Sequence, residues 1–388
     1  MPAQGNDCGI AVAGAGIAGL TTALCLARTG QASTVFERAP EFHEIGAGIQ
    51  LSPNAMHVLA GLGLADAVTR KASEPEAIDI RDGPTGALLA SIPLRRLCRT
   101  RYGAPYLAVH RADLMQVLLG AARSEPLISI RTGTPVECVE AGEQNVRFTA
   151  GGETVASETL LAADGVHSEI RRAVTGMQEE SLGKTAWRAT LYEPEYDEVV
   201  SAERTGLWFG RGAHMVHYPL RGGRELNLVL IGDAEAESPH YLLDHFERHV
   251  RGIAGAARWI PWPLLHVPAA GAWTAGRVAM LGDSAHAMLP TSAQGGAQAI
   301  EDAAVLASCV AGLSRNRSAD MASALADWER KRKPRVRRIA RQARRNLEIY
   351  TMSGLGVAAR NLAIRLIPAD RHLTRLDWLY GWRPPAGG

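Results

Sequence analysis

A glycine-rich turn near the start of the chain constrains the fold more than any other feature of the sequence. Gly14-x-Gly16-x-x-Gly19 separates a short apolar run, residues 9–13, from a helical pattern that ends at Gly30. Gly14 permits a tight turn, Gly16 lets a pyrophosphate approach the backbone, and Gly19 allows the helix to pack closely on the strand. The helix that follows offers unpaired N–H groups and the positive end of its dipole to a phosphate.

An acidic residue at the end of the next strand supports this interpretation. Residues 33–37 read STVFE, so Glu37 follows Gly19 by 18 residues and is placed to accept a hydrogen bond from a ribose hydroxyl. Strand, turn, helix and acid together predict a βαβ dinucleotide-binding unit over residues 9–37. This unit alone does not distinguish FAD from NAD.

Two more carboxylates follow apolar runs that read as buried strands. Asp164 comes directly after residues 159–163, and Asp283 comes after residues 277–281. Ligands of open α/β sheets bind at the C-terminal ends of the strands, so both carboxylates are placed to reach one. A glycine-rich turn at residues 294–296 then opens another helix, whose dipole could face an electron-rich ring edge.

The composition excludes several classes of function. Lys plus Arg number 42 against 40 for Asp plus Glu, and the net charge of +2 gives no general case for nucleic acid or an anionic membrane. The five Cys residues are far apart and form no CxxC pair, which argues against a zinc knuckle or a disulfide scaffold and fits a reducing cytosol. We see no signal peptide and no spanning segment, so we expect a cytoplasmic protein without stable membrane association.

One segment departs from the near-neutral average, because residues 330–345 are densely basic. Such a run could bind nucleic acid or an anionic membrane, or it could be a solvated helix face that pairs with acids elsewhere. No aromatic side chains interleave with it, as a single-strand binder would require. We favour the solvated helix face, and no nucleic-acid partner is expected.

Motifs along nearly the whole chain resemble the single-component FAD-dependent aromatic hydroxylases, which include the salicylate, 3-hydroxybenzoate and 6-hydroxynicotinate monooxygenases. That family has GxGxxG, a central Asp-Gly, and a Gly-Asp followed by P-x-x-x-Q-G, and all three occur here in order and at similar spacing. Further matching segments are 46–55 (GAGIQLSPNA), 110–114 (HRADL), 218–223 (YPLRGG), 328–335 (WERKRKPR) and 377–381 (DWLYG).

The resemblance implies an α/β fold like that of p-hydroxybenzoate hydroxylase. A Rossmann-like FAD-binding domain would comprise residues 1–75, 105–180 and 270–320, interleaved with an antiparallel-sheet substrate domain of residues 76–104 and 181–269. Residues 321–388 would form C-terminal helices. Because the chain has no second GxGxxG and no room for an NAD domain, the nicotinamide would dock transiently on the surface of a monomer or homodimer.

The resemblance also implies which residues hold FAD. The first turn and Glu37 would hold the ADP half, Arg111 would contact the flavin side, and Val136 would meet the adenine through its backbone. Asp283 would bind the ribityl chain, and Asp164 would serve FAD and NAD(P)H together. The full cofactor set is Gly14, Ala15, Gly16, Gly19, Glu37, Arg38, Ala47, Gly48, Arg111, Val136, Asp164, Asp283, Gly295 and Gly296.

The activity implied by the resemblance is ring hydroxylation of a phenolic or hydroxypyridine carboxylic acid. NADH or NADPH would reduce FAD, O₂ would add to give a flavin C4a-hydroperoxide, and one oxygen atom would pass to the aromatic substrate. The protein must orient the ring, activate it and exclude water. The alternative is a flavoprotein oxidase or epoxidase that acts on a non-aromatic or natural-product substrate.

Ring activation requires a base, and histidine suits that task near neutral pH. On a strand, His214 and Tyr218 share one face while His217 points to the other. The resemblance places a His and a Tyr four residues later at the substrate, so His214 and Tyr218 are the first choice and His217 the reserve. Pro290 would lie near the carbon of the flavin that reacts with oxygen.

Five further side chains have open roles at this point. His286 is favoured as a structural residue, and His43 either lies on a loop surface or approaches the flavin. Gln294 could contact substrate or flavin. Arg188 could meet a substrate carboxylate or form a surface salt bridge, and Trp187 is favoured as a packing residue.

Overall fold

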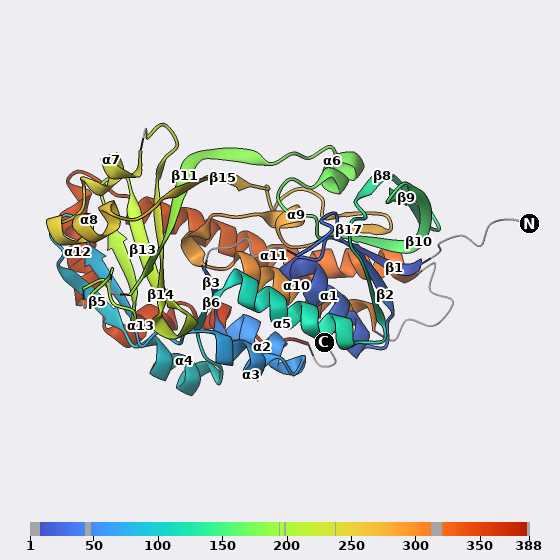
Figure 1. The fold of residues 1–388 in the computed structure, drawn as a ribbon, viewed down its shortest axis with the longest axis horizontal. Helices are drawn as coiled ribbons and strands as arrows, with labels where there is room; N and C mark the ends of the chain where they lie inside the picture. Colours follow the sequence, from blue (N-terminus) through green and yellow to red (C-terminus); the bar gives the residue numbers. More distant parts are fainter. Residues whose placement is uncertain are drawn as a thin grey trace, which may run out of the picture.

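Two large sheets lie side by side along the long axis of the molecule (Figure 1). The computed structural model describes residues 8–42, 48–193, 195–197, 199–236, 238–311 and 320–385. A small two-stranded sheet of β3 (Gly48–Leu51) and β6 (Leu107–His110) lies between the two large ones. The observed fold is the expected mixed α/β architecture.

The first sheet contains the βαβ unit that the sequence predicts. Its central strand, β1 (Cys8–Ala13), pairs in parallel with β2 (Ser33–Phe36) on one side and with β10 (Glu153–Ala162) on the other. Ile10 of β1 lies opposite Ser33 and Thr159. The hairpin of β8 (Val136–Ala141) and β9 (Val146–Ala150) extends β10 beyond the parallel part. The main path, in spatial order, is β16 (Thr274–Ala275), β17 (Val278–Met280), β10 (Glu153–Ala162), β1 (Cys8–Ala13), β2 (Ser33–Phe36) and β7 (Ile128–Arg131).

Helices cover the parallel strands, which explains why these strands read as continuous apolar runs. Val12 and Leu160 are fully buried. The helices that pack on or near the parallel strands are α1 (Ile17–Arg28), α5 (Arg111–Ser124) and α10 (Gly295–Val310). Shorter helices in the connections are α2 (Pro53–Gly61), α3 (Ala65–Lys71), α4 (Leu94–Tyr102), α6 (Glu169–Thr175) and α9 (Asp283–His286).

The second sheet has seven strands, all within residues 78–92 and 180–266. Neighbours run antiparallel except for β12 and β4, which are parallel. In spatial order the strands are β15 (Ile260–His266), β11 (Glu180–Tyr192), β14 (Glu225–Asp233), β13 (His214–Leu220), β12 (Thr205–Phe209), β4 (Ile78–Asp82) and β5 (Leu88–Ile92).

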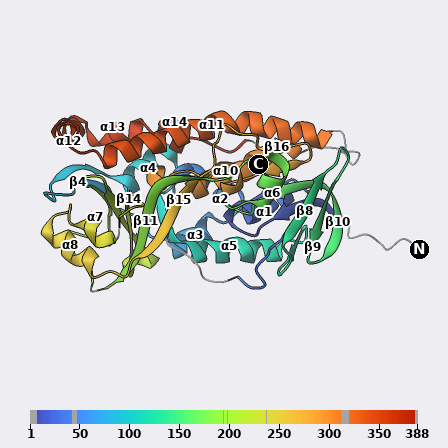
Figure 2. The ribbon, with the colours of Figure 1, turned by 90° about the horizontal axis from the view of Figure 1, so that it is seen from above.

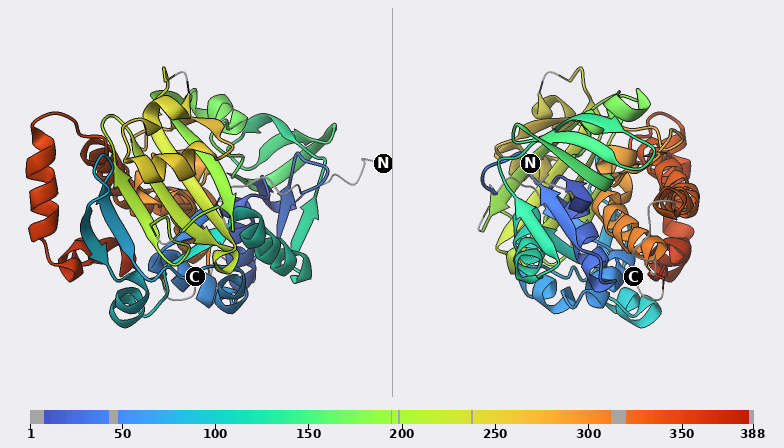
Figure 3. Two further views of the ribbon diagram at one scale, coloured as in Figure 1. Left: turned by 60° about the vertical axis from the view of Figure 1, so that its left-hand side comes forward. Right: turned by 90° about the vertical axis from the view of Figure 1, so that its right-hand side faces the viewer.

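The two faces of this second sheet have different surroundings. Alternate residues such as Met215, Leu228 and Leu230 form the outer core beneath α7 (Pro239–Leu243) and α8 (Arg248–Gly255). Figure 3 shows these two helices across that face. We call the opposite side, which turns toward β3, β6 and the C-terminal helices, the inner face.

The long helix α11 (Asp320–Tyr350) passes both sheets, as Figure 2 shows from above. It carries Pro334 in its interior. Three short helices follow: α12 (Gly356–Leu366), α13 (Ala369–Thr374) and α14 (Asp377–Tyr380). Within the described part of the chain, no helix is long and apolar enough to cross a membrane, and no group of three metal-ligating side chains occurs.

Candidate active site

The glycine turn has the geometry that its sequence predicts. Gly14 adopts φ +98°, and a Cβ there would lie 2.5 Å from the carbonyl oxygen of Ala163. A Cβ on Gly19 would lie 1.8 Å from the carbonyl oxygen of Gly14, so only glycine permits this helix–strand contact. A Cβ on Gly16 would meet nothing within 4 Å, which leaves open space beside the N-terminus of α1.

Glu37 lies at the mouth of this turn and is held there by backbone N–H groups. Its two carboxylate oxygens accept hydrogen bonds from Ala15 (2.8 Å) and Ala39 (2.9 Å). Each oxygen keeps a second lone pair for a ribose hydroxyl. The N–H of Thr134 donates to the Glu37 carbonyl, which brings nearby Val136 to the same edge. Arg38 is exposed beside them.

The carboxylates of the two Gly–Asp elements lie at one edge of the first sheet, because β10 and β17 run in parallel with Ala162 opposite Met280. Asp164 has one buried oxygen without a partner, and burial raises the pKa of its carboxyl. Asp283 is exposed, and its carboxylate is the nearest group to the position of a Cβ on Gly295, at 4.0 Å.

The N-terminus of α10 completes this edge. The helix has 16 residues, begins at Gly295, and receives no side-chain cap from Gln294. A Cβ on Gly296 would lie 2.4 Å from Ile49 of β3, so this turn packs closely against the small sheet. Gly48 of the same strand pairs with His110, directly before Arg111, the exposed first residue of α5.

The described residues around this edge therefore fit FAD. An open glycine turn and two helix N-termini offer N–H groups to anionic and electron-rich parts of the cofactor. Glu37, Asp164 and Asp283 offer acceptors to its hydroxyl groups, and the unpartnered oxygen of Asp164 requires such a donor. Ala47 and His43, which were also expected near the flavin, lie outside the described residues.

On the second sheet, strand β13 separates the candidate histidines as the period-two alternation predicts. His214 and Tyr218 lie on the inner face, against Tyr350 of α11 and Gly48 of β3 respectively. His217 lies on the outer face, where the indole N–H of Trp208 donates to its Nδ1 (3.2 Å).

His214 is the candidate base, and its environment keeps it neutral. The side chain is 1% exposed, and its Nδ1 has no partner. Burial, with a smaller effect of Lys184, lowers the pKa of His214 to about 3. A neutral imidazole can accept a proton from a ring hydroxyl. The negative charge left on that ring oxygen would then raise the pKa of the imidazole.

Tyr218 and Asn227 fix Gly48 at the boundary between the two sheets. The Tyr218 hydroxyl donates to the Gly48 carbonyl (2.7 Å), and the Gly48 N–H donates to Asn227 Oδ1 (3.1 Å). Asn227 was not singled out from the sequence. The signal that could have found it is a lone polar side chain within the apolar run of residues 225–232 (ELNLVLIG). Its Nδ2 is buried and has no partner.

Two further buried polar atoms without partners belong to the same region. They are Nε of Arg188, on the inner face of β11, and Oγ of Ser292, in the short turn that begins at Pro290. Arg188 stacks over Trp262 at 5.1 Å and has no acidic partner in the described chain, so the expected alternative of a salt bridge is not observed. Trp187, on the other face of β11, packs on the outer core, as expected.

Gln294 has a structural role that the sequence left open. It is fully buried; its oxygen accepts from Asn54 (3.2 Å) and Gln298 (3.1 Å), and its NH₂ donates to Ser52 (2.8 Å). These bonds fix the turn that precedes Gly295, and they leave no atom of the side chain without a partner.

Part of the basic run on α11 lies in the interior rather than on a solvated face. Arg332 is 1% exposed and bonds to Glu301 (2.6 Å) and Asp302 (2.7 Å), which are both fully buried. Arg335 also bonds to Glu301 (2.7 Å), and His286 Nε2 bonds to Asp302 (2.6 Å), which gives His286 the expected structural contact. Pairing with acids is thus observed, and the solvated face is formed by other members of the run, such as the exposed Arg338 and Arg345.

Two of the segments that resemble the hydroxylase family, residues 218–223 and 110–114, contact each other. Arg221 of YPLRGG forms a bidentate pair with Asp113 of HRADL, at 2.9 and 3.3 Å, and also bonds to Glu225. The pair ties the loop after β13 to the first turn of α5, beside Arg111. It therefore connects the second sheet to the region expected to hold the cofactor.

Comparison with known proteins identifies the family. The family model described as "FAD binding domain" matches residues 7–343. The chain is 36% identical to 3-hydroxybenzoate 6-hydroxylase 1 of Aquipseudomonas alcaligenes, across 96% of this chain and 97% of the relative. It is 35% identical to 3-amino-4-hydroxybenzoate 2-monooxygenase of Streptomyces cremeus, across 97% and 95%.

A solved structure shares the fold. HpxO of Klebsiella pneumoniae, complexed with FAD and uric acid, superposes with a TM-score of 0.83 at 24% identity, covering 96% of each chain. The sequence matches extend over both sheets and most of α11, so they include the glycine turn, both Gly–Asp elements and strand β13. The chain therefore belongs to the FAD-dependent aromatic hydroxylases, as a flavoprotein monooxygenase.

Proposed function

We propose that this enzyme uses NADH or NADPH and O₂ to hydroxylate the ring of a phenolic or hydroxypyridine carboxylic acid. The carrying observation is the set of buried polar atoms without partners at the second sheet and the adjoining turn. Buried polar groups rarely lack partners, so such a set marks a place where a polar ligand belongs. Among the described residues, the four atoms used here are His214 Nδ1, Asn227 Nδ2, Arg188 Nε and Ser292 Oγ; Trp187 Nε1 and Thr205 Oγ1 of the same sheet also lack partners.

The chemistry of these groups matches an aromatic acid that carries a hydroxyl. His214 is held neutral by burial and can take the proton of a ring hydroxyl, which makes the ring electron-rich. Arg188 is a cation without an anionic partner among the described residues, and it suits a carboxylate. From the strand register, the two Cα atoms lie two strands and two residues apart, or roughly 12 Å, which leaves room for a ring between the side chains.

When bound, FAD supplies the redox chemistry, which includes hydride uptake from the nicotinamide and activation of O₂. The residues of the chain orient it. Tyr218 and Asn227 hold Gly48, and Gln294 holds the turn before Gly295. The apolar side chains Val216, Leu220 and Val229 near Tyr218 exclude water from the space where oxygen transfer would occur.

We extend the proposal to the organisation of the chain. Residues 1–75, 105–180 and 270–320 would form the FAD-binding domain, residues 76–104 and 181–269 the substrate domain, and residues 321–388 the helical region. The enzyme would act in the cytoplasm as a monomer or homodimer.

The test is a substrate panel on the FAD-loaded protein. Hydroxybenzoates, aminohydroxybenzoates and hydroxypyridine carboxylates are added in turn, while NAD(P)H loss, H₂O₂ and ring products are measured together. The proposal predicts that one aromatic acid accelerates NAD(P)H oxidation and yields a hydroxylated product in near-equal amount. NAD(P)H loss that yields only H₂O₂ with every aromatic acid would instead favour an oxidase or epoxidase with a non-aromatic substrate.

A further inference from the structure

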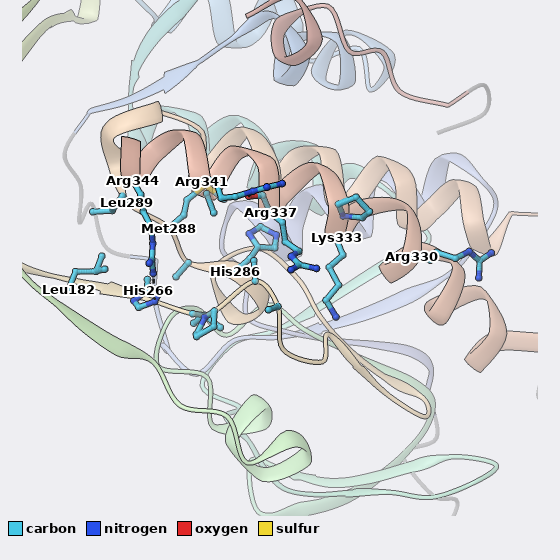
Figure 4. A pocket seen from close by; sticks show the side chains of 17 residues that line it. Leu182, His266, His286, Met288, Leu289, Arg330, Lys333, Arg337, Arg341 and Arg344 are labelled. Atoms are coloured by element: carbon cyan, nitrogen blue, oxygen red, sulfur yellow. Dashed lines mark hydrogen bonds between the residues drawn. The ribbon is translucent and has the colours of Figure 1, made fainter. Parts of the chain in front are cut away.

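A large basic groove lies alongside α11. Its volume is about 740 Å³, which is within the range of small-molecule and cofactor sites. One wall is α11, and the other consists of residues 266–270 and 286–289. The cations that line it from the helix are Arg330, Lys333, Arg337, Arg341 and Arg344 (Figure 4).

Three of these cations have no carboxylate partner among the described residues. Arg337, Arg341 and Arg344 follow a spacing of four and three residues, so they occupy one side of the helix. Arg344 contacts His266 (3.0 Å), which itself pairs with Glu180. Like charges at this spacing repel one another, so a bound anion would stabilise them.

The other two cations at the groove are already neutralised. Arg330 pairs with Asp327, and Lys333 pairs with Glu329, both within α11. The part of the groove that can bind an anion is therefore the stretch from Arg337 to Arg344.

The floor of the groove contains a buried hydrogen-bonding atom without a partner. His286 is 1% exposed, and its Nδ1 has no partner. Burial alone would raise the pKa of Asp302, but His286 and Arg332 outweigh it and hold that pKa below its usual range. Asp302 is therefore a carboxylate that accepts a hydrogen bond from His286 Nε2, which leaves His286 Nδ1 as the ring atom that a ligand could bond.

The groove adjoins the candidate active site. Its wall at residues 286–289 connects Asp283, at the FAD edge, to Pro290. Leu289 also packs with Ala186 and Ile231, which belong to the inner face of the second sheet. A ligand with a long, extended shape could therefore keep its anionic part on α11 and direct its other end toward the flavin.

We propose that this groove binds the reduced pyridine nucleotide, with its pyrophosphate against Arg337, Arg341 and Arg344. The inference rests on the proposed function, because that reaction requires a soluble two-electron donor and the chain has no second dinucleotide turn. A pyridine nucleotide combines a pyrophosphate with ribose hydroxyls and a carboxamide, which can hydrogen-bond to His286 Nδ1. A fatty acid that placed its carboxylate against these cations would have no second polar group for His286 Nδ1.

The test compares a charge-reversed variant with a matched control on the same helix. The FAD-loaded double variant Arg337→Glu/Arg341→Glu is set against Arg345→Glu, an exposed arginine of α11 that does not line the groove. Calorimetry measures binding of an inert tetrahydronicotinamide analogue of NADH and NADPH. Anaerobic stopped-flow absorbance measures how flavin reduction depends on NADH and NADPH concentration.

We expect the double variant to bind both the analogue and NAD(P)H at least about tenfold more weakly, as the loss of one strong ionic contact would produce. The limiting rate of flavin reduction and the Kd of the aromatic substrate should stay within about twofold, and Arg345→Glu should match the wild type. The single variant Arg337→Ala should show a smaller loss of nucleotide affinity in the same direction.

Two results would overturn the assignment while leaving the proposed function intact. One is an unchanged Kd for the analogue in a double variant that still reduces its flavin with NAD(P)H. The other is an unchanged nucleotide Kd together with lost binding of oleate, which would make the groove a site for a fatty anion. Failure of the wild type to oxidise NAD(P)H, although dithionite reduces its flavin, would instead refute the proposed function.

Discussion

Replacing the buried Arg332 with methionine should destabilise the protein far more than replacing an arginine on the exposed side of α11. The guanidinium donates to Glu301 (2.6 Å), Asp302 (2.7 Å) and the side chain of Gln298 (2.7 Å). Both carboxylates are fully buried. Methionine fills a similar volume but removes every one of these bonds, so two buried anions lose a shared cation.

The expected loss of unfolding free energy depends on the contacts that Glu301 and Asp302 keep in the variant. Breaking a buried ion pair by removing one partner costs about 3–5 kcal/mol. Glu301 keeps Arg335, and Asp302 keeps His286, so neither anion is left alone. We therefore expect the lower end, about 3 kcal/mol. For 388 residues, with an unfolding entropy of roughly 2.1 cal/mol/K per residue, this corresponds to a Tm decrease of about 4 °C.

The loss should also depend on pH with a definite sign. Burial would raise the pKa of Glu301, but Arg332 and Arg335 outweigh it, so the folded pKa lies below the unfolded value. Such a group stabilises the fold above its unfolded pKa, near 4.3, and that contribution is lost as pH falls through the folded pKa. Arg332→Met raises the folded pKa, so its deficit should be largest at pH 7 and smaller at pH 4.

Urea unfolding followed by far-ultraviolet circular dichroism measures this deficit at pH 7 and pH 4. Arg345→Met, on an exposed site of the same helix, is the control and should change the unfolding free energy by no more than about 0.5 kcal/mol. A deficit below about 1 kcal/mol for Arg332→Met, or one that grows toward pH 4, would refute the argued role of this buried network.

Three other predictions concern the candidate active site and the outer core. His214→Asn should lower kcat/KM for hydroxylation by about 10²–10⁴-fold with little change in the Kd of FAD, and equal losses in both would contradict its role as base. Arg188→Leu should raise the KM of a carboxylate substrate by about tenfold and leave that of its uncharged amide analogue unchanged; an equal rise for both would exclude a carboxylate contact. Burial lowers the pKa of His217 to about 3, below the unfolded value near 6.5, so its folded form resists protonation and stability rises with pH between these values. The unfolding free energy of the wild type should therefore fall between pH 7.5 and pH 5.5, and in His217→Gln this fall should be smaller by about 1.4 kcal/mol. Urea unfolding at both pH values measures the difference, and an equal fall in both proteins would contradict the prediction.

The parts of the fold that the sequence predicts are those set by local rules. The glycine turn between β1 and α1 has one steric solution, since a Cβ at Gly14 or Gly19 would overlap a carbonyl oxygen. The opposite directions of His214 and His217 follow from the period of a strand. The prediction that the face with His214 and Tyr218 turns toward the flavin rested on the family resemblance.

The contacts missed in the sequence join residues far apart in the chain. Arg332 pairs with Glu301 and Asp302 across about thirty residues, and nothing in a basic run reveals that one of its members points into the interior. The Asn227 contact to Gly48 spans 179 residues and requires the two sheets to be placed first. Tertiary packing decides such pairs, so local pattern and charge composition could not supply them.

The most direct test of the proposed hydroxylation measures the source of the oxygen atom in the product. The FAD-loaded enzyme is supplied with NAD(P)H, ¹⁸O₂ and the aromatic acid that most accelerates nucleotide oxidation, and the product is analysed by mass spectrometry. The account predicts one ¹⁸O atom in a new ring hydroxyl for each NAD(P)H consumed. A product whose new oxygen comes from water, or NAD(P)H oxidation that yields only labelled H₂O₂, would contradict it.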